Sequence, residues 1–168
     1  GLSNTISSTS PNYGFIGGGR INVISGTARH GVILGGESNK LTAGNHSAIV
    51  GGTSNVISNF RSFIGGGENN SISWNHSGLI GGRYNTIHAL YSFQGGGYSS
   101  DVTGWYAGII GGIDNNVTGY YSGIFGGRNN TVTHTNSIAL GGSGLTSTAD
   151  DTVYVPNLNI GIIGSGTS

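Results

Sequence analysis

The chain has no cysteine, no methionine, only two prolines, and so few charged residues (7%) that its formal net charge is zero. The lack of cysteine excludes a disulfide framework. The lack of a basic patch argues against nucleic acid as a partner, and no apolar run approaches the ~20 residues that a helix needs to cross a bilayer. No signal-peptide pattern is present. Low charge with alternating apolar residues argues against disorder, and 168 residues suggest one domain.

Glycine is what the chain has in excess, with 35 residues, many of which fall into recurring pairs. We number each repeat from the first glycine of its pair, which is position 0. The position 0 residues are Gly18, Gly35, Gly51, Gly66, Gly81, Gly96, Gly111, Gly126 and Gly141. The interval is 15 residues from Gly51 onward, and the two earlier intervals are 17 and 16. Such fixed periodicity indicates one small structural unit stacked many times.

Two aliphatic columns accompany the glycines. Position −2 holds Ile16, Ile33, Ile49, Ile64, Leu79, Gln94, Ile109, Ile124 and Ala139; position +6 holds Ile24, Leu41, Ile57, Ile72, Ile87, Val102, Val117 and Val132. β-Branched residues, which strands favour, dominate both columns. The pattern predicts an all-β, parallel β-solenoid of about 15 residues per coil, with two short strands and two turns in each coil. We expect about nine coils over residues 1–147, followed by a non-repeating C-terminal strand and cap segment over 148–168.

The first strand of each coil is apolar on both faces. The side chains at positions −3 and −1 point opposite to the one at position −2. Where one of these two positions holds a large side chain the other often holds glycine, as in Phe15 with Gly17 or Gly123 with Phe125. A strand that is apolar on both faces must be covered on both, and further copies of the chain are the expected cover. The sequence therefore predicts a homotrimer, whose interface residues are Phe15, Phe63, Ile80, Phe93, Ile110 and Phe125.

The segment Asn-Ser-Ile-Ala-Leu-Gly-Gly at 136–142 resembles the repeat of the YadA-type head domain of trimeric autotransporter adhesins. The small residue at position −4, the apolar strand and the glycine at position 0 recur over about residues 1–147. This resemblance implies a left-handed parallel β-roll that is assembled as a trimer and acts in adhesion. Residues 152–161 are similar to segments of bacteriophage tail fibres that precede a self-cleaving chaperone domain. Together the resemblances imply an extracellular attachment fibre, on a virion tail or a cell-surface appendage.

The turn at positions −7 to −5 is rich in amphipathic aromatic side chains. The candidate ligand-binding residues there are Trp74, His76, Tyr91, Trp105, Tyr106, Tyr120 and Tyr121, with His30, His46 and Arg61 in earlier coils. Such side chains are enriched at recognition surfaces, and their flat faces suit sugar rings. The alternative is an aromatic ladder that only fills the corner of the coil.

Two other columns have structural explanations. The asparagines at position +4 are expected to bond to one another and to turn backbone rather than to a ligand. Position +2 is expected to be a solvated turn face, where Arg20 could pair with Glu37, and Glu68 with Arg83, across one coil step.

Other functional classes find little support in the sequence. No histidine or carboxylate cluster has metal-ligand spacing, so we expect no metal and no cofactor. A glycosidase needs two carboxylates ~5–9.5 Å apart, and Glu37 and Glu68, which share a column two coils apart, lie beside no evident cleft. No catalytic residue is therefore assigned. A flat threonine array for binding ice is limited to one mixed column at position +7.

The sequence thus favours a trimeric fibre segment, joined to the rest of a fibre, that binds a receptor on a host cell surface. A glycan is the favoured receptor class, and a protein is the other. A stiff spacer that binds nothing, or a tailspike that degrades polysaccharide, remain as alternatives.

Overall fold

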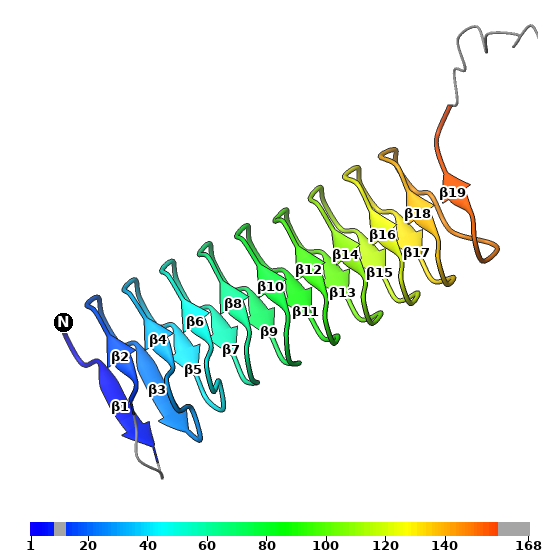
Figure 1. Cartoon of the computed structure of the whole chain (residues 1–168). Coiled ribbons are helices and arrows are strands. Elements are labelled where there is room, and N and C mark those ends of the chain that lie inside the picture. Colours follow the sequence, from blue (N-terminus) through cyan, green and yellow to red (C-terminus); the bar gives the residue numbers. More distant parts are fainter. Residues whose placement is uncertain (9–12, 158–168) are drawn as a thin grey trace, which may run out of the picture.

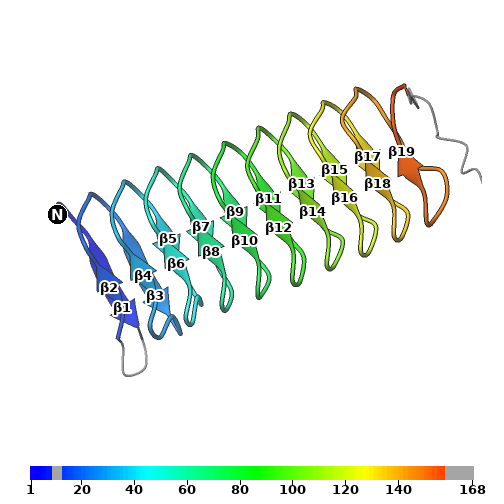
Figure 2. The ribbon, with the colours of Figure 1, turned by 45° about the horizontal axis from the view of Figure 1, so that its top comes forward.

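The structure is a computed structural model that describes residues 1–8 and 13–157. The chain winds as a rod-shaped β-solenoid of about 10 turns with about 15 residues per turn, and the described residues contain no helix. Successive turns add strands to two sheets that run along the rod, and within each sheet neighbouring strands are parallel (Figures 1 and 2). The prediction of an all-β parallel solenoid is confirmed.

The strands of the two sheets alternate along the sequence. The first sheet contains β1 (Thr5–Ser8), β3 (Val23–Gly26), β5 (Lys40–Leu41), β7 (Val56–Ile57), β9 (Ser71–Ile72), β11 (Thr86–Ile87), β13 (Asp101–Val102), β15 (Asn116–Val117) and β17 (Thr131–Val132). The second contains β2 (Phe15–Ile16), β4 (Val32–Ile33), β6 (Ala48–Ile49), β8 (Phe63–Ile64), β10 (Gly78–Leu79), β12 (Phe93–Gln94), β14 (Gly108–Ile109), β16 (Gly123–Ile124), β18 (Ile138–Ala139) and β19 (Val153–Tyr154). Each strand pairs with its counterpart one coil away.

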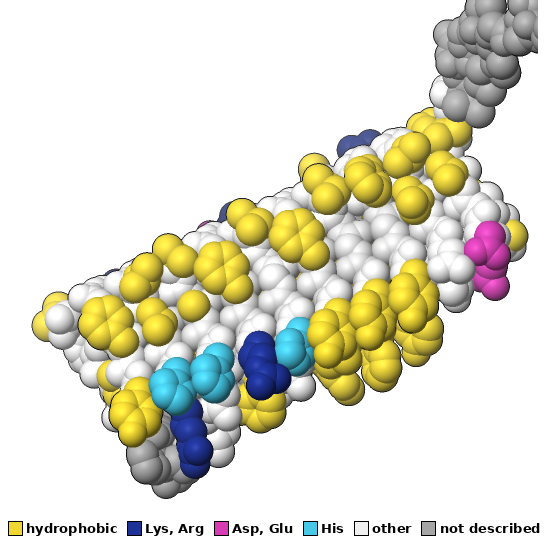
Figure 3. Space-filling view, in the orientation of Figure 1, with side chains coloured by type: hydrophobic (Ala, Val, Ile, Leu, Met, Phe, Trp, Pro, Cys, Tyr) yellow, Lys and Arg dark blue, Asp and Glu magenta, His cyan; other side chains and the backbone are white. Residues whose placement is uncertain are grey.

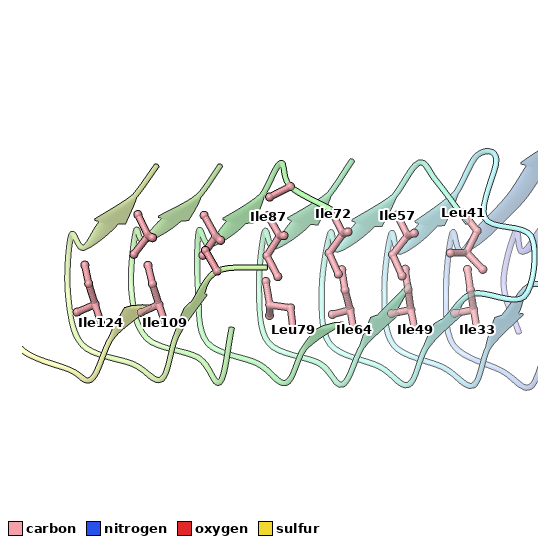
Figure 4. Close-up of a cluster of buried hydrophobic side chains, with 14 of the residues drawn as sticks. Ile33, Leu41, Ile49, Ile57, Ile64, Ile72, Leu79, Ile87, Ile109 and Ile124 are labelled. Carbon is pink, nitrogen blue, oxygen red and sulfur yellow. The ribbon is translucent and has the colours of Figure 1, made fainter. Parts of the chain in front are cut away.

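The two predicted aliphatic columns form the interior of the rod. Ile49 and Ile64 from the second sheet lie opposite Ile57 from the first, and all three are fully buried (Figure 4). Complete burial of such a side chain stabilises a fold by about 1.5–3 kcal/mol. Because each coil contributes only one such side chain from each sheet, the core depends on continuous stacking along the rod.

The second glycine of each pair, at position +1, is required by the backbone. At Gly52 the φ angle is +83°, and an added Cβ would lie 2.1 Å from the carbonyl oxygen of Gly67 in the next coil. Gly67 has the same relation to Gly82. Only glycine accepts both this backbone conformation and this close approach.

The asparagines at position +4 form a buried hydrogen-bond ladder. The Nδ2 group of Asn55 donates to the carbonyl oxygens of Gly51 in its own coil, at 3.1 Å, and of Gly67 in the next coil, at 3.0 Å. Its Oδ1 atom accepts the backbone N–H of Asn70 at 3.0 Å. Equivalent bonds recur in most coils, at Asn22, Asn39, Asn70, Asn85, Asn115 and Asn130. The predicted structural role of this column is confirmed.

Serine at position −4 forms a second ladder, which sequence analysis did not identify. The hydroxyl of Ser62 donates to the carbonyl oxygen of Trp74 at 3.0 Å and accepts the backbone N–H of Ser77 at 3.4 Å. The hydroxyl of Ser77 in turn donates to the carbonyl oxygen of Ala89 at 2.7 Å. These bonds fix the turn at positions −7 to −5 to the coil before it, so the aromatic turns are held in register.

One coil departs from these regular columns. Gln94 replaces the aliphatic residue at position −2, and its buried Oε1 has no hydrogen-bond partner among the described residues. Ser100 replaces asparagine at position +4, and it still accepts the backbone N–H of Asn115 at 3.2 Å. Burial raises the pKa of the Asp101 carboxyl, an effect that nearby His88 partly offsets. This coil is therefore expected to be the least stable in the regular part of the rod.

The register of the solenoid continues beyond residue 147. Strand β19 pairs with β18, which places Val153 opposite Ile138 and Tyr154 opposite Ala139. The strand expected in the C-terminal segment is therefore the last strand of the second sheet. Residues 158–168 of the predicted cap segment lie outside the described residues. Within the described ranges, no helix is long and apolar enough to cross a membrane.

Candidate functional site

The outward side chains of the second sheet form an apolar strip along one face of the rod (Figure 3). The apolar strip consists of large side chains at positions −3 and −1, namely Phe15, Leu34, Val50, Phe63, Ile80, Phe93, Ile110, Phe125, Leu140 and Val153. In the single chain the six predicted interface residues are exposed, from 39% at Phe63 to 54% at Phe125. A contiguous exposed stripe of this kind marks an interaction surface.

The alternation of large side chains and glycine at positions −3 and −1 makes the surface of the apolar strip uneven. Gly108 and Gly123 contribute to the lining of a groove of about 230 Å³ that is also bordered by Ile110, Phe125 and Tyr121. Projecting phenylalanine and isoleucine side chains thus alternate with hollows at glycine. Relief of this type allows the close shape complementarity found at the centre of protein interfaces.

In most coils, no neighbouring atom of the described chain requires the first residue of the pair, at position 0, to be glycine. At Gly51, Gly66 and Gly81 an added Cβ would have no atom within 4 Å, and φ does not lie in the left-handed region. The same is true of Gly18 and Gly35. Glycine within regular structure costs roughly 0.5–1 kcal/mol relative to alanine. Its recurrence beside the apolar strip is explained if the backbone of another chain approaches here.

The side chains at position −5 form a stacked ridge at one corner of the coils. The stacked ridge consists of Tyr13, His30, His46, Arg61, His76, Tyr91, Tyr106 and Tyr121. Ring centroids are 4.8 Å apart between His30 and His46, with an interplanar angle of 18°. They are 5.1 Å apart between Tyr106 and its two tyrosine neighbours, at 12–13°. The spacing matches the distance of about 4.8 Å between stacked strands, so each coil adds one side chain to the ridge.

Four further aromatic residues lie next to the stacked ridge, at positions −7 and −6: Phe60, Trp74, Trp105 and Tyr120. The ring centroids of Trp105 and Tyr120 are 5.9 Å apart at 31°, and those of Trp74 and Trp105 are 6.2 Å apart at 46°. These tilted contacts cover less of each ring face than parallel stacking does. All seven candidate ligand-binding residues therefore gather along the same corner of the rod, in two rows.

The exposure of these rings changes the two interpretations drawn from sequence. The aromatic ladder of the alternative interpretation is present, but it lies on the outside of the corner: small buried residues such as Ala89 and Ser77 occupy the interior, whereas Tyr121 is 60% exposed. The expectation that flat faces are available for sugars holds only in part. Along the stacked ridge the faces cover one another, which leaves ring edges and polar atoms open to a ligand.

Backbone preference does not explain the large side chains of the stacked ridge. His76, Tyr91 and Tyr106 all have φ of 54–58°, in the left-handed region that disfavours residues other than glycine, asparagine and aspartate. Position +3, at the opposite corner, has the same conformation but holds mainly small polar residues: Ser38, Ser54, Asn69, Ser99, Asp114 and Asn129. Unusual backbone conformations that persist in a structure often accompany function. The rings are therefore best explained by the surface that they create.

The opposite corner carries the charged side chains of position +2. Arg20 pairs with Glu37, and Arg83 lies 3.1 Å from Glu68, so both predicted ion pairs form. Glu37 and Glu68, the two carboxylates that share a column, are thus each engaged by an arginine. Among residues 1–8 and 13–157, no three His, Cys, Asp or Glu side chains lie close enough to hold a metal ion.

Comparison with protein-family models and with curated proteins finds no match to this chain. The functional argument is therefore carried by the two surfaces, the apolar strip and the stacked ridge with its neighbouring aromatic row.

Proposed function

We propose that the chain is a segment of a homotrimeric attachment fibre, with the apolar strip at the trimer interface. The observation that carries this proposal is the coincidence of two features on one face. Large apolar side chains are exposed there, and the adjoining position 0 keeps glycine although the described chain leaves room for a side chain. Both features are explained when another copy packs against this face.

A closed assembly of three chains can bury the single apolar strip that each chain carries. Cyclic symmetry repeats the same contact around an axis, so each strip is hidden without leaving an open edge for further growth. The resemblance of residues 136–142 to the YadA-type repeat favours three copies over two. The volume exchange along the strip, with glycine opposite phenylalanine, provides space where side chains converge on the axis.

The stacked ridge and its neighbouring aromatic row serve as the receptor-binding surface in this proposal. They lie at a corner of the coil where Tyr106 and Tyr121 are about half exposed. A trimer presents three copies of this surface, and linked copies gain avidity without any new contact. A cell-surface glycan is the favoured receptor, because tyrosine and tryptophan combine apolar edges with hydrogen-bonding groups. The protein would then act outside the cell, as part of a virion tail fibre or a surface appendage.

Adsorption to host cells tests the receptor-binding role. We expect the double variant Tyr106→Ala/Tyr121→Ala to lose adsorption while the circular dichroism spectrum of the native fold is retained. The matched control is Tyr84→Ala/Tyr98→Ala, because these two tyrosines are similarly exposed but lie in the +3 and +2 columns. If both double variants adsorb like the native protein, the segment is a spacer and the proposed receptor surface is wrong.

Incubation with host polysaccharide separates the binding role from a degrading one. We expect no release of reducing sugar ends, because the carboxylates Glu37 and Glu68 are held in ion pairs at the opposite corner. Release of reducing ends that is lost in Glu68→Gln would replace the proposed function with that of a hydrolase.

A further inference from the structure

The N-terminal half of the stacked ridge differs chemically from its aromatic C-terminal half. In four successive coils, position −5 holds His30, His46, Arg61 and His76. Figure 3 shows histidine and Lys or Arg side chains in a row along this edge, followed by hydrophobic side chains toward the C-terminal end. His30 stacks on His46 at 4.8 Å, and Arg61 Nη1 lies 3.5 Å from His76 Nε2. Three of the five histidines of the chain thus form one line.

Within residues 1–8 and 13–157, no Asp or Glu side chain lies beside this line of basic side chains. Both ion pairs of the described chain are at position +2, at the opposite corner. On the ridge corner itself, acidic residues occur only at Asp150 and Asp151, five coils beyond His76. The titratable and charged side chains that adjoin the three histidines are Tyr13, Arg29, Arg61 and Tyr91, and none of them is an acid.

Protonation makes this line a site for negative charge. Histidine is the side chain that gains positive charge in mildly acidic solution. Once protonated, side chains stacked one coil apart repel one another. An anion that lies along the outer edge of the line offsets this repulsion, so its binding is linked to proton uptake. A hollow of about 150 Å³, lined by Asn45, His46, Phe60 and Arg61, has room for an anionic group beside Arg61.

We propose that the line formed by His30, His46, Arg61 and His76 binds the carboxylates of a linear acidic polysaccharide and that binding tightens on acidification. This inference deepens the proposed function, on which it rests, by naming the class of glycan. A linear chain fits because the basic groups repeat at each coil along a straight rod, with centroids 4.8 Å apart between His30 and His46. The carboxylates would lie on the basic half, and uncharged parts of the glycan would contact the aromatic half.

The charge content favours a glycan over nucleic acid. Nucleic-acid binding depends on many permanent cations that displace counterions from phosphates. Near neutral pH the line contains one permanent cation, Arg61, and Arg29 adjoins it as a second, while the other half of the stacked ridge consists of tyrosine side chains. Few permanent cations suit a ligand that combines carboxylates with numerous hydroxyl groups.

Fluorescence anisotropy with a labelled linear oligosaccharide of galacturonic acid tests the inference. We expect about tenfold tighter binding at about pH 5.5 than at about pH 7.5, because three exposed charge pairs, each of modest strength, form in acid. The same oligosaccharide with its carboxyl groups reduced to alcohols should bind weakly at both pH values. Arg61→Gln should weaken binding at both, and His46→Gln should reduce the pH dependence. Arg128→Gln, a cation at position +2 outside the line, is the matched control and should bind like the native protein.

Three results would overturn the inference. They are equal binding of the reduced oligosaccharide, equally tight binding of polyphosphate or a single-stranded oligonucleotide, and no binding of oligogalacturonate at either pH. The native circular dichroism spectrum must be retained in each variant. If oligogalacturonate does not bind but cells are still adsorbed through Tyr106 and Tyr121, this inference fails and the proposed function stands. If no cells are adsorbed, the proposed function itself fails.

Discussion

Removal of one amide from the asparagine ladder is expected to destabilise the whole rod. In Asn55→Ala the backbone N–H of Asn70 loses its acceptor, and the carbonyl oxygen of Gly51 loses its donor. Gly67 is less affected, because its carbonyl oxygen also accepts the backbone N–H of Thr53. Each buried polar group left without a partner costs about 1–3 kcal/mol. The two groups together predict a loss of roughly 2–6 kcal/mol in the free energy of unfolding.

A graded series separates hydrogen bonding from general loss of packing. Ser100 shows that a hydroxyl at position +4 can accept the N–H of the next coil, since Asn115 donates to it at 3.2 Å. Asn55→Ser should therefore leave only the Gly51 carbonyl oxygen unpaired and lose about half as much stability as Asn55→Ala. The reverse change, Ser100→Asn, should stabilise the protein by about 1–2 kcal/mol through restored bonds.

Chemical denaturation followed by circular dichroism, at one fixed protein concentration, measures the series. Thr53→Ala, an exposed change in the same coil, is the control and should lie within about 0.5 kcal/mol of the native protein. The reasoning would be refuted if Asn55→Ala and Asn55→Ser were equally stable, or if Ser100→Asn were destabilising.

Three further substitutions test other parts of the account. Gly67→Ala should prevent folding because its Cβ would overlap the next coil, whereas Gly66→Ala should keep the β-solenoid spectrum but weaken the proposed trimer. Circular dichroism and light scattering compare the two variants, and equal effects would contradict the assignment of the two glycines. Gln94→Ile should raise the thermal unfolding temperature because it removes a buried oxygen without a partner, and a lower temperature would contradict this. Because burial raises the pKa of the Asp101 carboxyl, its ionised form destabilises the folded protein at pH values above the ordinary aspartate pKa. Asp101→Thr should therefore stabilise the protein more at neutral pH than in strong acid, and an equal gain in stability at both pH values would be inconsistent with the raised pKa.

The regular parts of the fold could be predicted from sequence because each coil repeats the same pattern of residue types. The columns containing Ile57 and Ile64 identify the two inward faces, and the asparagine column identifies the ladder that bonds them. Periodicity of this kind averages over many copies, so one exception, such as Gln94, does not hide the pattern. The extra strand β19 was harder to recognise, because Pro156 stands where position 0 would hold glycine.

The geometry of the candidate site could be predicted only in part. The aromatic residues of positions −7 to −5 were located, but the parallel stacking of Tyr91 on Tyr106 depends on backbone conformation, and residue type alone does not reveal it. The serine ladder at position −4 was also missed, because a small residue in a tight corner has a steric explanation that does not require its hydroxyl group. The contrast between the two glycines of a pair became visible only when the space around each was known.

The mass of the protein in solution tests the central claim most directly. Light scattering on the chain described by this sequence should give three times the 17.0 kDa of one chain, because each apolar strip is covered only when copies assemble. A stable single chain of 17.0 kDa, with Phe63 and Phe125 accessible to solvent, would contradict the account.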